Sequence, residues 1–269
     1  MRVPAPTDAE ILDRAKTYPY ALSPRSFVFA GGQARELLGP SGAPLVEARV
    51  GLTGRLGSAL GEVPGLGKAE LAAKVPVLAY GSNAAPAVLA RKTARSDFPG
   101  PESIVVLRCE LHDHDVVFSA HIAAYGAVPA TLQASPGVCA HVFLMLLSDG
   151  QLAALRATEP NYELVRLPEA RVEAEWGVRA SAPRAFLSRH GCLEAGGEEV
   201  ALAAVPATGR RLRAWTGLET LRFAAARLAP ERELDDFILE SARDPSAPGR
   251  RTRELRPFSR PFVGTRRPG

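Results

Sequence analysis

Short apolar runs bounded by turn residues dominate the middle of the chain, a pattern typical of β-strands. The two clearest runs are residues 75–80 (VPVLAY) and 138–147 (VCAHVFLMLL), each with the length of a buried strand. Further strands are predicted at residues 26–30, 102–110, 115–120, 130–134, 162–167, 170–175, 185–188 and 199–205. Residues 111–114 (LHDH) predict a hairpin turn between two of these strands, and Pro136-Gly137 predict another turn.

Helical signals flank this strand-rich section. The capping box TDAE predicts a helix over residues 8–17, and the capping box TGLE predicts another that ends near residue 228. The other predicted helices cover residues 33–38, 84–92, 148–157 and 230–243. Because hairpins rather than regular βαβ alternation dominate the middle, the pattern indicates an α+β fold.

Composition supports a globular protein of one large domain or two small ones. The chain has 269 residues, of which 46% are hydrophobic and 23% charged. Its apolar runs fall short of the roughly 18–20 residues that a membrane span needs, so no membrane partner is expected. The N-terminus lacks an apolar signal core, and the three cysteines are too widely spaced for a disulfide framework or a zinc pattern. These features predict a cytoplasmic location, with Cys139 as a buried small hydrophobe.

Positive charge gathers at the C-terminal end of a chain whose net charge is +4. Residues 249–269 contain seven arginines and a single acidic residue, Glu254. Such a segment is usually a solvated tail or a strap along the domain surface, and Phe258 and Phe262 would anchor a strap. No nucleic-acid partner is expected, because no recognised nucleic-acid module accompanies the charge.

Residues 80–83, Tyr80-Gly81-Ser82-Asn83, form the most distinctive local motif. They join the predicted strand 75–80 to the predicted helix 84–92. Gly81 tolerates unusual backbone angles, and Ser82 and Asn83 are both suitable helix N-caps. A small-residue loop leading into a helix N-terminus can bind an anion. From these residues alone, an ordinary strand–turn–helix connection is the alternative.

Other candidate motifs are weaker. The segment GEVPGLGK is similar to a phosphate-binding loop, but Ala69 stands where Ser or Thr would hold magnesium. The sequence His112-Asp113-His114-Asp115 offers metal-ligand types, yet alternate residues of an extended chain point to opposite sides. A polar hairpin tip is the better interpretation, and no metal is expected.

Three stretches, taken in order, resemble the γ-glutamylcyclotransferase-like superfamily. They are VLAYGSN with the helix after it, the segment LHDHDVVFSAHIAAYGAVPATLQASPG, and AHVFLMLLSDGQLAALRATEPNY. The resemblance covers about residues 75–172, less than half of the chain. It implies a small, mostly antiparallel β-barrel flanked by helices.

The resemblance also implies a chemistry that needs no cofactor. A γ-glutamyl amide would cyclise to 5-oxoproline and release a free amine, with Glu159 as the general acid/base in a partly desolvated pocket. Tyr80, Gly81, Ser82 and Asn83 match the substrate-binding loop, and Tyr162 matches a tyrosine that closes over the substrate. The expected partner is therefore a small γ-glutamyl molecule. A binding or regulatory module that has lost the chemistry is the alternative.

The chain departs from the family pattern at two places. Pro160-Asn161 replace the usual glycine after the catalytic Glu, and Val128-Pro129 replace paired glycines in a pocket wall. Pro160 disfavours a helical conformation at Glu159, so it either holds the carboxylate or diverts it. The predicted organisation is an N-terminal extension (1–74) with a glycine-rich loop or linker at residues 51–67, the cyclotransferase-like domain (75–205) and C-terminal helices with the Arg-rich tail (206–269). The leaving amine and a possible homodimer stay open.

Overall fold

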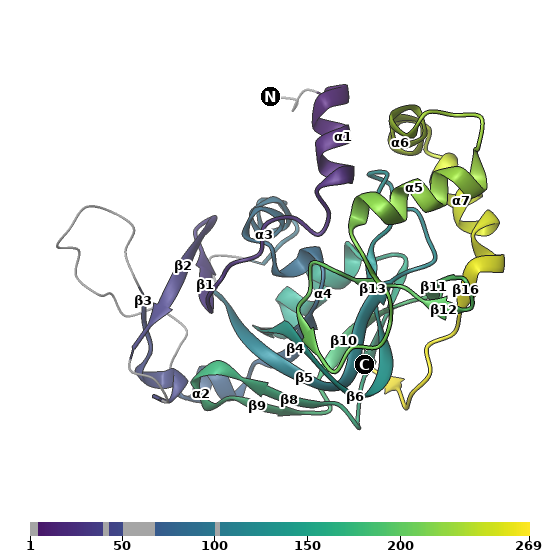
Figure 1. Ribbon diagram of the computed structural model, residues 1–269. Helices are drawn as coiled ribbons and strands as arrows, with labels where there is room; N and C mark the ends of the chain where they lie inside the picture. Colours follow the sequence, from purple (N-terminus) through teal and green to yellow (C-terminus); the bar gives the residue numbers. More distant parts are fainter. Residues whose placement is uncertain (1–4, 40–42, 51–67, 100–102) are drawn as a thin grey trace.

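The computed structural model describes residues 5–39, 43–50, 68–99 and 103–269 (Figure 1). The helices are α1 (Asp8–Lys16), α2 (Lys68–Ala72), α3 (Pro86–Thr93), α4 (Asp149–Ala157), α5 (Gly217–Leu228), α6 (Leu234–Arg243) and α7 (Ala247–Glu254), with 3-10 turns η1 (Leu45–Glu47), η2 (Ser82–Ala84), η3 (Glu175–Gly177) and η4 (Arg256–Phe258). The first strands are β1 (Phe27–Ala30), β2 (Gln33–Leu38), β3 (Arg49–Val50), β4 (Val75–Ala79), β5 (Ile104–Phe118), β6 (Ala130–Leu147), β7 (Tyr162–Arg166), β8 (Arg171–Ala174) and β9 (Arg179–Ser181). The remaining strands are β10 (Arg184–Ser188), β11 (Cys192–Ala195), β12 (Glu198–Glu199), β13 (Ala201–Leu202), β14 (Ala207–Thr208), β15 (Ala214–Trp215), β16 (Ser259–Arg260) and β17 (Arg267–Pro268).

The predicted α+β class is confirmed. A mixed sheet runs in the order β17-β7-β10-β4-β6-β5-β1-β2-β3, with shorter strands attached at its side. Its strand pairing forms an open path through the described residues, so the barrel implied by the resemblance is not closed there. The predicted glycine-rich loop at residues 51–67 lies outside the described residues.

Two long antiparallel strands, β5 and β6, form the centre of the sheet. The turns predicted at 111–114 and at Pro136-Gly137 are therefore wrong. Both positions instead lie inside strands, where the pairing shifts register between His112 and His114. Asp113, at the irregularity, has a φ of 58° and its carboxylate accepts a hydrogen bond of 2.9 Å from the Gly137 amide. The bulge lets polar residues sit inside a continuous strand without ending it.

The helix predicted at residues 33–38 is also wrong, because this segment is strand β2 and pairs antiparallel with β1. Gly31 and Gly32, which connect the two strands, have φ values of 56° and 77°. Two consecutive residues with positive φ match the twist of a tight hairpin, and glycine adopts this conformation without strain. The Gly31-Gly32 turn therefore makes this segment the second strand of a hairpin, although its mixed apolar pattern indicated a helix.

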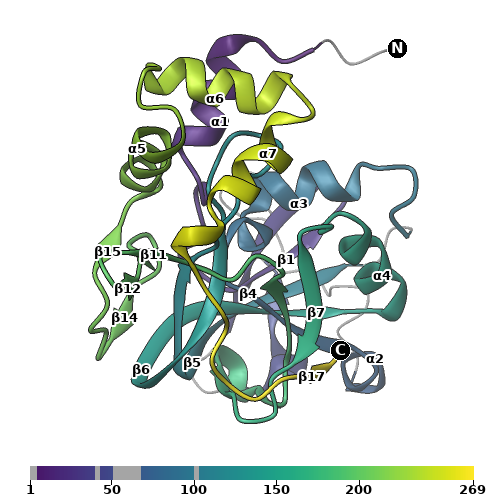
Figure 2. The same cartoon turned by 90° about the vertical axis from the view of Figure 1, so that its right-hand side faces the viewer.

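The two predicted capping boxes are confirmed, since Thr7 and Thr216 cap helices α1 and α5 through side-chain hydrogen bonds. Ser148 caps α4 in the same way. Helix α6 begins at Leu234, later than predicted, and α7 was not expected from the pattern. Figure 2 shows α1, α5, α6 and α7 gathered on one side of the molecule, next to the sheet. Among the described residues, no helix combines the length and apolar character that a membrane crossing requires.

The Arg-rich C-terminal segment is a strap rather than a solvated tail. It leaves α7 and pairs first, through β16, with β11 of a small three-stranded sheet (Figure 1), and then, through β17, with β7 of the large sheet (Figure 2). Phe258 and Phe262 pack against the core, as expected for anchors.

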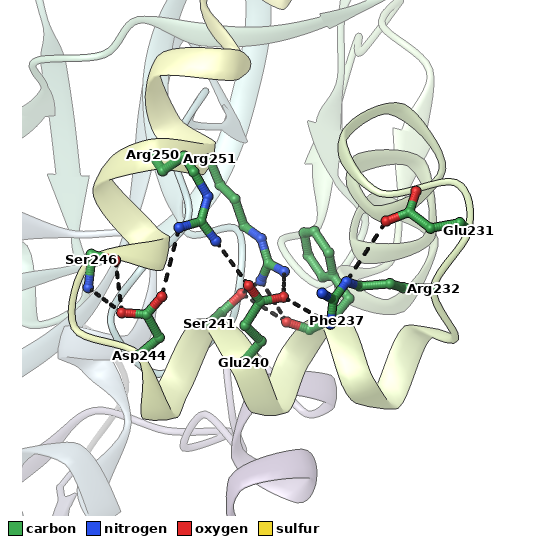
Figure 3. Close-up of polar contacts among 9 residues, drawn as sticks. All are labelled: Glu231, Arg232, Phe237, Glu240, Ser241, Asp244, Ser246, Arg250 and Arg251. Carbon is green, nitrogen blue, oxygen red and sulfur yellow. Dashed lines mark hydrogen bonds and ion pairs between the residues drawn. The ribbon is translucent and has the colours of Figure 1, made fainter.

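The first arginines of this segment belong to α7, where they bind helix α6 (Figure 3). Arg251 is buried; it donates to Glu240 at 2.7 Å and lies 3.7 Å from the centre of the Phe237 ring. Arg250 donates to the same Glu240 carboxylate at 2.8 Å. These guanidinium groups therefore hold two helices together. The expectation that the chain has no nucleic-acid partner stays an untested prediction.

Contacts cross the predicted boundary at residue 74. Strand β1 pairs with β5, so residues before this boundary are part of the central sheet. The division into three segments remains a sequence-based prediction.

The three cysteines are free, and Cys139, expected to be buried, is only partly buried, because it faces outward from β6.

Candidate active site

A cavity of about 430 Å³ lies at the end of strand β4. All six residues proposed from the sequence as site residues line it: Tyr80, Gly81, Ser82, Asn83, Glu159 and Tyr162. They come from the loop after β4, the turn after α4, and the start of β7. The structure therefore brings together two segments that are nearly eighty positions apart in the chain.

The loop after β4 does not enter helix α3 in the predicted way. Ser82–Ala84 form a 3-10 turn, and α3 starts at Pro86 with Ala85 as an N-cap that makes no side-chain hydrogen bond. The prediction that Ser82 or Asn83 caps the helix is wrong, because the extra 3-10 turn separates them from its first residue. The Asn83 side chain is thus available to the cavity.

Position 81 requires glycine because another side chain approaches it closely, and not because of its backbone angles. Its φ of −132° and ψ of −143° are not in the left-handed region. A Cβ at this position would lie 2.6 Å from the Tyr18 hydroxyl oxygen. That hydroxyl accepts a hydrogen bond of 2.8 Å from the Ala130 amide, which fixes Tyr18 against the loop. The N-terminal segment therefore shapes the cavity directly.

Replacing Gly81 with alanine is expected to lower the free energy of unfolding by about 1–3 kcal/mol, since the methyl group overpacks a buried contact. Urea unfolding measures this change, and calorimetry measures the accompanying loss of ligand binding. The Gly81→Ala, Tyr18→Phe double variant removes the hydroxyl that the methyl meets and should recover part of both losses. Wild-type stability of Gly81→Ala alone would contradict the argument.

A tight turn places Glu159 at the cavity. The Tyr162 amide donates to the Glu159 carbonyl oxygen at 3.1 Å, which closes a turn over residues 159–162. Pro160 occupies the second position of this turn, where its restricted φ is favourable. The departure from the family pattern thus holds Glu159 at the cavity rather than diverting it.

The Glu159 carboxylate has two polar partners in the cavity. Asn83 Nδ2 donates to Glu159 Oε1 at 3.0 Å, and Lys92 Nζ donates to the same oxygen at 2.6 Å. Lys92 also donates to Asn83 Oδ1 at 2.7 Å, which completes a triangle of three side chains. The Lys92 and Glu159 side chains are 16% and 15% exposed, which matches the expected partial desolvation of the carboxylate.

Lys92 is the functional candidate that sequence reasoning missed. It lies in the last turn of α3, next to Arg91. Basic residues in a last helical turn are common because they interact favourably with the helix dipole, so the position carries no distinctive signal. Its one distinguishing feature, the contact with Glu159, is formed only by the fold.

Three tyrosines form much of the cavity wall: Tyr18 and Tyr80 are buried, and Tyr162 is partly buried. The Tyr162 hydroxyl donates to the Ala130 carbonyl oxygen at 2.9 Å, and the Tyr80 hydroxyl donates to the Phe186 carbonyl oxygen. Burial raises the pKa of Tyr18, Tyr80 and Tyr162 above the usual value. These phenols are therefore neutral at physiological pH, and their hydroxyl groups fix the wall instead of exchanging protons.

A second polar network borders the cavity beside Tyr162. His121 Nδ1 lies 2.6 Å from the Ser119 hydroxyl, and the His121 ring is packed 5.0 Å from the ring of His190. Burial, with a smaller contribution from His190, lowers the pKa of His121 to about 3. The imidazole is neutral at physiological pH and therefore adds no cation to this wall. His190 in turn contacts Asn161 of the 159–162 turn at 3.2 Å.

The mouth of the cavity carries positive charge. Arg14 of α1 lies 4.6 Å from the centre of the Tyr125 ring, and Arg91 of α3 lies 6.0 Å from that of Tyr20. Neither guanidinium forms an ion pair with an acidic residue in the described part of the chain, whereas Arg95 is paired with Asp97 at 2.7 Å. Burial and the nearby Arg14 lower the pKa of Arg91, as expected for two cations that face the same space. Arg14 and Arg91 are therefore available to an anionic group of a ligand.

Comparisons with known proteins give limited information. No family model matches the chain, and no curated protein matches it. Among solved structures, one described as "Gamma-glutamyl cyclotransferase" is similar at 15% sequence identity and a TM-score of 0.33, over 73% of this chain and 94% of that chain. A likeness this distant carries no argument about activity, so a functional proposal rests on the cavity of this chain.

Proposed function

We propose that this protein is a γ-glutamyl amide cyclotransferase that releases 5-oxoproline and a free amine, with Glu159 as its general acid/base. The observation that carries the proposal is the 3.0 Å hydrogen bond from Asn83 to the Glu159 carboxylate inside one cavity. It joins the two segments that the resemblance links to the substrate and to proton transfer. A carboxylate directed away from residues 80–83 would have favoured a protein without this chemistry.

The charges of the cavity complement an α-amino-acid head group. Such a group carries an ammonium and a carboxylate on the same carbon, and Glu159 and Lys92 present the opposite charges side by side, 2.6 Å apart. An incoming ligand can pair its ammonium with Glu159 and its carboxylate with Lys92. Charge-assisted hydrogen bonds of this kind are stronger than neutral ones. This complementarity favours a γ-glutamyl group over a phosphate.

The reaction needs two proton transfers and a folded substrate. Glu159 accepts a proton from the α-ammonium, and the resulting amine attacks the side-chain carbonyl carbon to form the C–N bond of a five-membered lactam. The bond from that carbon to the leaving nitrogen breaks, and Glu159 returns the proton to the departing amine. The attacking nitrogen gives up its second proton to solvent as it becomes the lactam N–H, and the released amine takes up one proton from solvent to become an ammonium. A single carboxylate serves both transfers. The cavity contributes by holding the substrate in its cyclising conformation, which gives the intramolecular attack its advantage.

The reaction also needs hydrogen-bond donors that stabilise negative charge on the substrate. The loop after β4 is suited to supply them. Gly81, Ser82 and Asn83 line the cavity with small side chains, so backbone amides can approach a substrate closely. Amide donors aimed at a developing oxyanion stabilise the transition state in a site that excludes water. Tyr162, anchored through its hydroxyl, provides an apolar ring on which the folded γ-glutamyl chain can pack.

Incubation of the protein with a panel of γ-glutamyl dipeptides and γ-glutamyl amines, followed by detection of 5-oxoproline, tests the function. A binding or regulatory module is the second candidate, because a carboxylate already paired with Lys92 also suits the capture of an amino-acid head group without reaction. Calorimetry on the same panel separates the two. Binding with 5-oxoproline formation supports the enzyme, and binding without it supports the module.

The positive mouth of the cavity indicates which leaving amine is preferred. A γ-glutamyl group held at Glu159 and Lys92 has its amide end directed to the rest of the cavity, where Arg14 and Arg91 have no acidic partner among the described residues. We infer that the leaving amine carries a negatively charged group. A carboxylate on that amine would make the pairing that these guanidinium groups lack.

Replacing Arg14 or Arg91 with glutamine is expected to lower kcat/KM for an anionic leaving amine roughly tenfold, about 1.4 kcal/mol, because one charge-assisted contact is lost. A neutral leaving amine of similar size should be turned over unchanged. Steady-state kinetics with this substrate pair measures the ratio. The matched control is Arg95→Gln, since Arg95 also lines the cavity but is paired with Asp97. Equal effects of all three variants would contradict the inference.

A further inference from the structure

A group of possible metal ligands lies on the outer face of the sheet, separate from the cavity. Glu110 and His112 are two positions apart on β5 and share one face of the strand. Cys139 of β6 is directly opposite His112 in the antiparallel pair. None of the three lines the cavity. The group is thus built on the two longest strands of the fold, which hold its members in register.

The three side chains already converge. One ligand atom from each of Glu110, His112 and Cys139 lies within 4.8 Å of the other two. In a tetrahedral zinc site with Zn–N near 2.0 Å and Zn–S near 2.3 Å, ligand atoms are separated by roughly 3.5 Å. Coordination therefore requires the ligand atoms to move closer together, and the Glu110 side chain, which is 49% exposed, has room to move.

His112 adds an independent observation. Its Nε2 atom is buried and has no hydrogen-bond partner, and the nearest carboxylate oxygen, on Glu110, is 3.9 Å away. A buried polar atom without a partner is unfavourable, and native proteins satisfy nearly all such atoms. A cation bound between His112, Glu110 and Cys139 would satisfy this nitrogen. No hydrogen bond within the described residues satisfies it.

We propose that Glu110, His112 and Cys139 form a binding site for a zinc-class divalent cation. Thiolate, imidazole and carboxylate together are a donor set that suits Zn²⁺ and disfavours Mg²⁺ or Ca²⁺, which prefer oxygen ligands alone. Binding forms the bond from the metal to Cys139 Sγ and releases the thiol proton to solvent. No electron transfer is involved.

Strand β8 places charged residues beside the three ligands. Glu173 is opposite Glu110, and Arg171, opposite His112, extends to Asp113 at 3.5 Å. The three ligands themselves come from β5 and β6, next to the irregularity at Asp113. A cation there would link β5 and β6 where their pairing shifts register, which is a structural role.

Metal titration of the full-length protein tests the proposal. The protein, first treated with a chelator, is titrated with Co²⁺ and then with Zn²⁺. One equivalent of Co²⁺ should give a thiolate-to-cobalt charge-transfer band that Zn²⁺ abolishes, and Zn²⁺ should raise Tm. Cys139→Ser should remove the band, and Cys139→Ser and His112→Ala should each weaken Zn²⁺ binding by at least about tenfold, the minimum expected when a ligand itself is lost.

Cys109→Ala is the matched control, because this thiol lies one position from Glu110 but faces the interior. It should keep the cobalt band and the Zn²⁺-induced rise in Tm. Circular dichroism of each metal-free variant establishes that it is folded. Failure of the folded wild type to bind one equivalent, or retention of the band in Cys139→Ser, would overturn the proposal.

Discussion

Replacing Glu159 with glutamine is expected to lower kcat for 5-oxoproline release roughly 10²–10⁴-fold, the usual contribution of a general acid/base. Glutamine keeps the size of the side chain and can still accept a hydrogen bond from Asn83 and Lys92. It cannot accept the proton of the substrate ammonium or return it to the leaving amine. The chemical step should therefore fail while the cavity persists, and steady-state kinetics with ligand binding by calorimetry measures both.

Glu163→Gln is the matched control for this experiment. Glu163 follows Tyr162 on β7, but its side chain is 46% exposed and lies near Arg266 instead of the cavity. This variant should retain wild-type turnover. If Glu159→Gln were as active as the wild type, Glu159 would not be the proton-transfer group. If the wild type bound γ-glutamyl compounds and turned over none, the binding-module alternative would replace the enzyme.

Replacing Arg210 with methionine is expected to lower the free energy of unfolding by about 3–5 kcal/mol, the usual cost of breaking a buried ion pair from one side. The Asp115 side chain on β5 is fully buried, and Arg210 binds it in a bidentate manner, with contacts of 2.7 Å from Nη2 and 2.8 Å from Nε. Without Arg210, the 2.8 Å hydrogen bond from the Val116 amide is the one that the carboxylate keeps within the described part of the chain. A buried charge with so few partners strongly destabilises the folded state.

Urea unfolding followed by circular dichroism measures this loss. Arg211→Met removes the neighbouring, exposed arginine and should leave the midpoint close to that of the wild type. The double variant Asp115→Asn, Arg210→Met removes both charges and should be more stable than Arg210→Met alone. An unchanged midpoint for Arg210→Met would show that Asp115 is solvated or neutralised in another way.

Local patterns predicted those elements whose signals lie within a few residues. The capping boxes at Thr7 and Thr216 are examples, because their hydrogen bonds join residues three positions apart. The loop 80–83 and Glu159, which line one cavity, were singled out from an order of motifs that resembles the superfamily. Each of these predictions depends on neighbouring positions or on the order of motifs, both of which are present in the chain before it folds.

The errors arise where a partner distant in the sequence overrides a local signal. Residues 111–114 indicate a turn by composition, yet they continue β5 because β6 pairs along this segment and Arg210 neutralises the adjacent Asp115 from 95 positions away. Asn83 is a suitable N-cap by type, yet its side chain binds Glu159. In both cases a long-range contact satisfies a polar group that local rules would have placed at a turn or a cap.

The sequence by itself determined the α+β class, the capped helices and the identities of the residues around the proposed site. Only the tertiary structure decided how these residues act together: Lys92 reaches Glu159 across 67 positions, and Tyr18 closes against Gly81 from the N-terminal segment. The physical reason is the range of the interactions. Caps and tight turns are formed by neighbours whose geometry the backbone restricts, whereas the ion pair and the cavity wall depend on side-chain directions that exist only once distant strands and helices are packed.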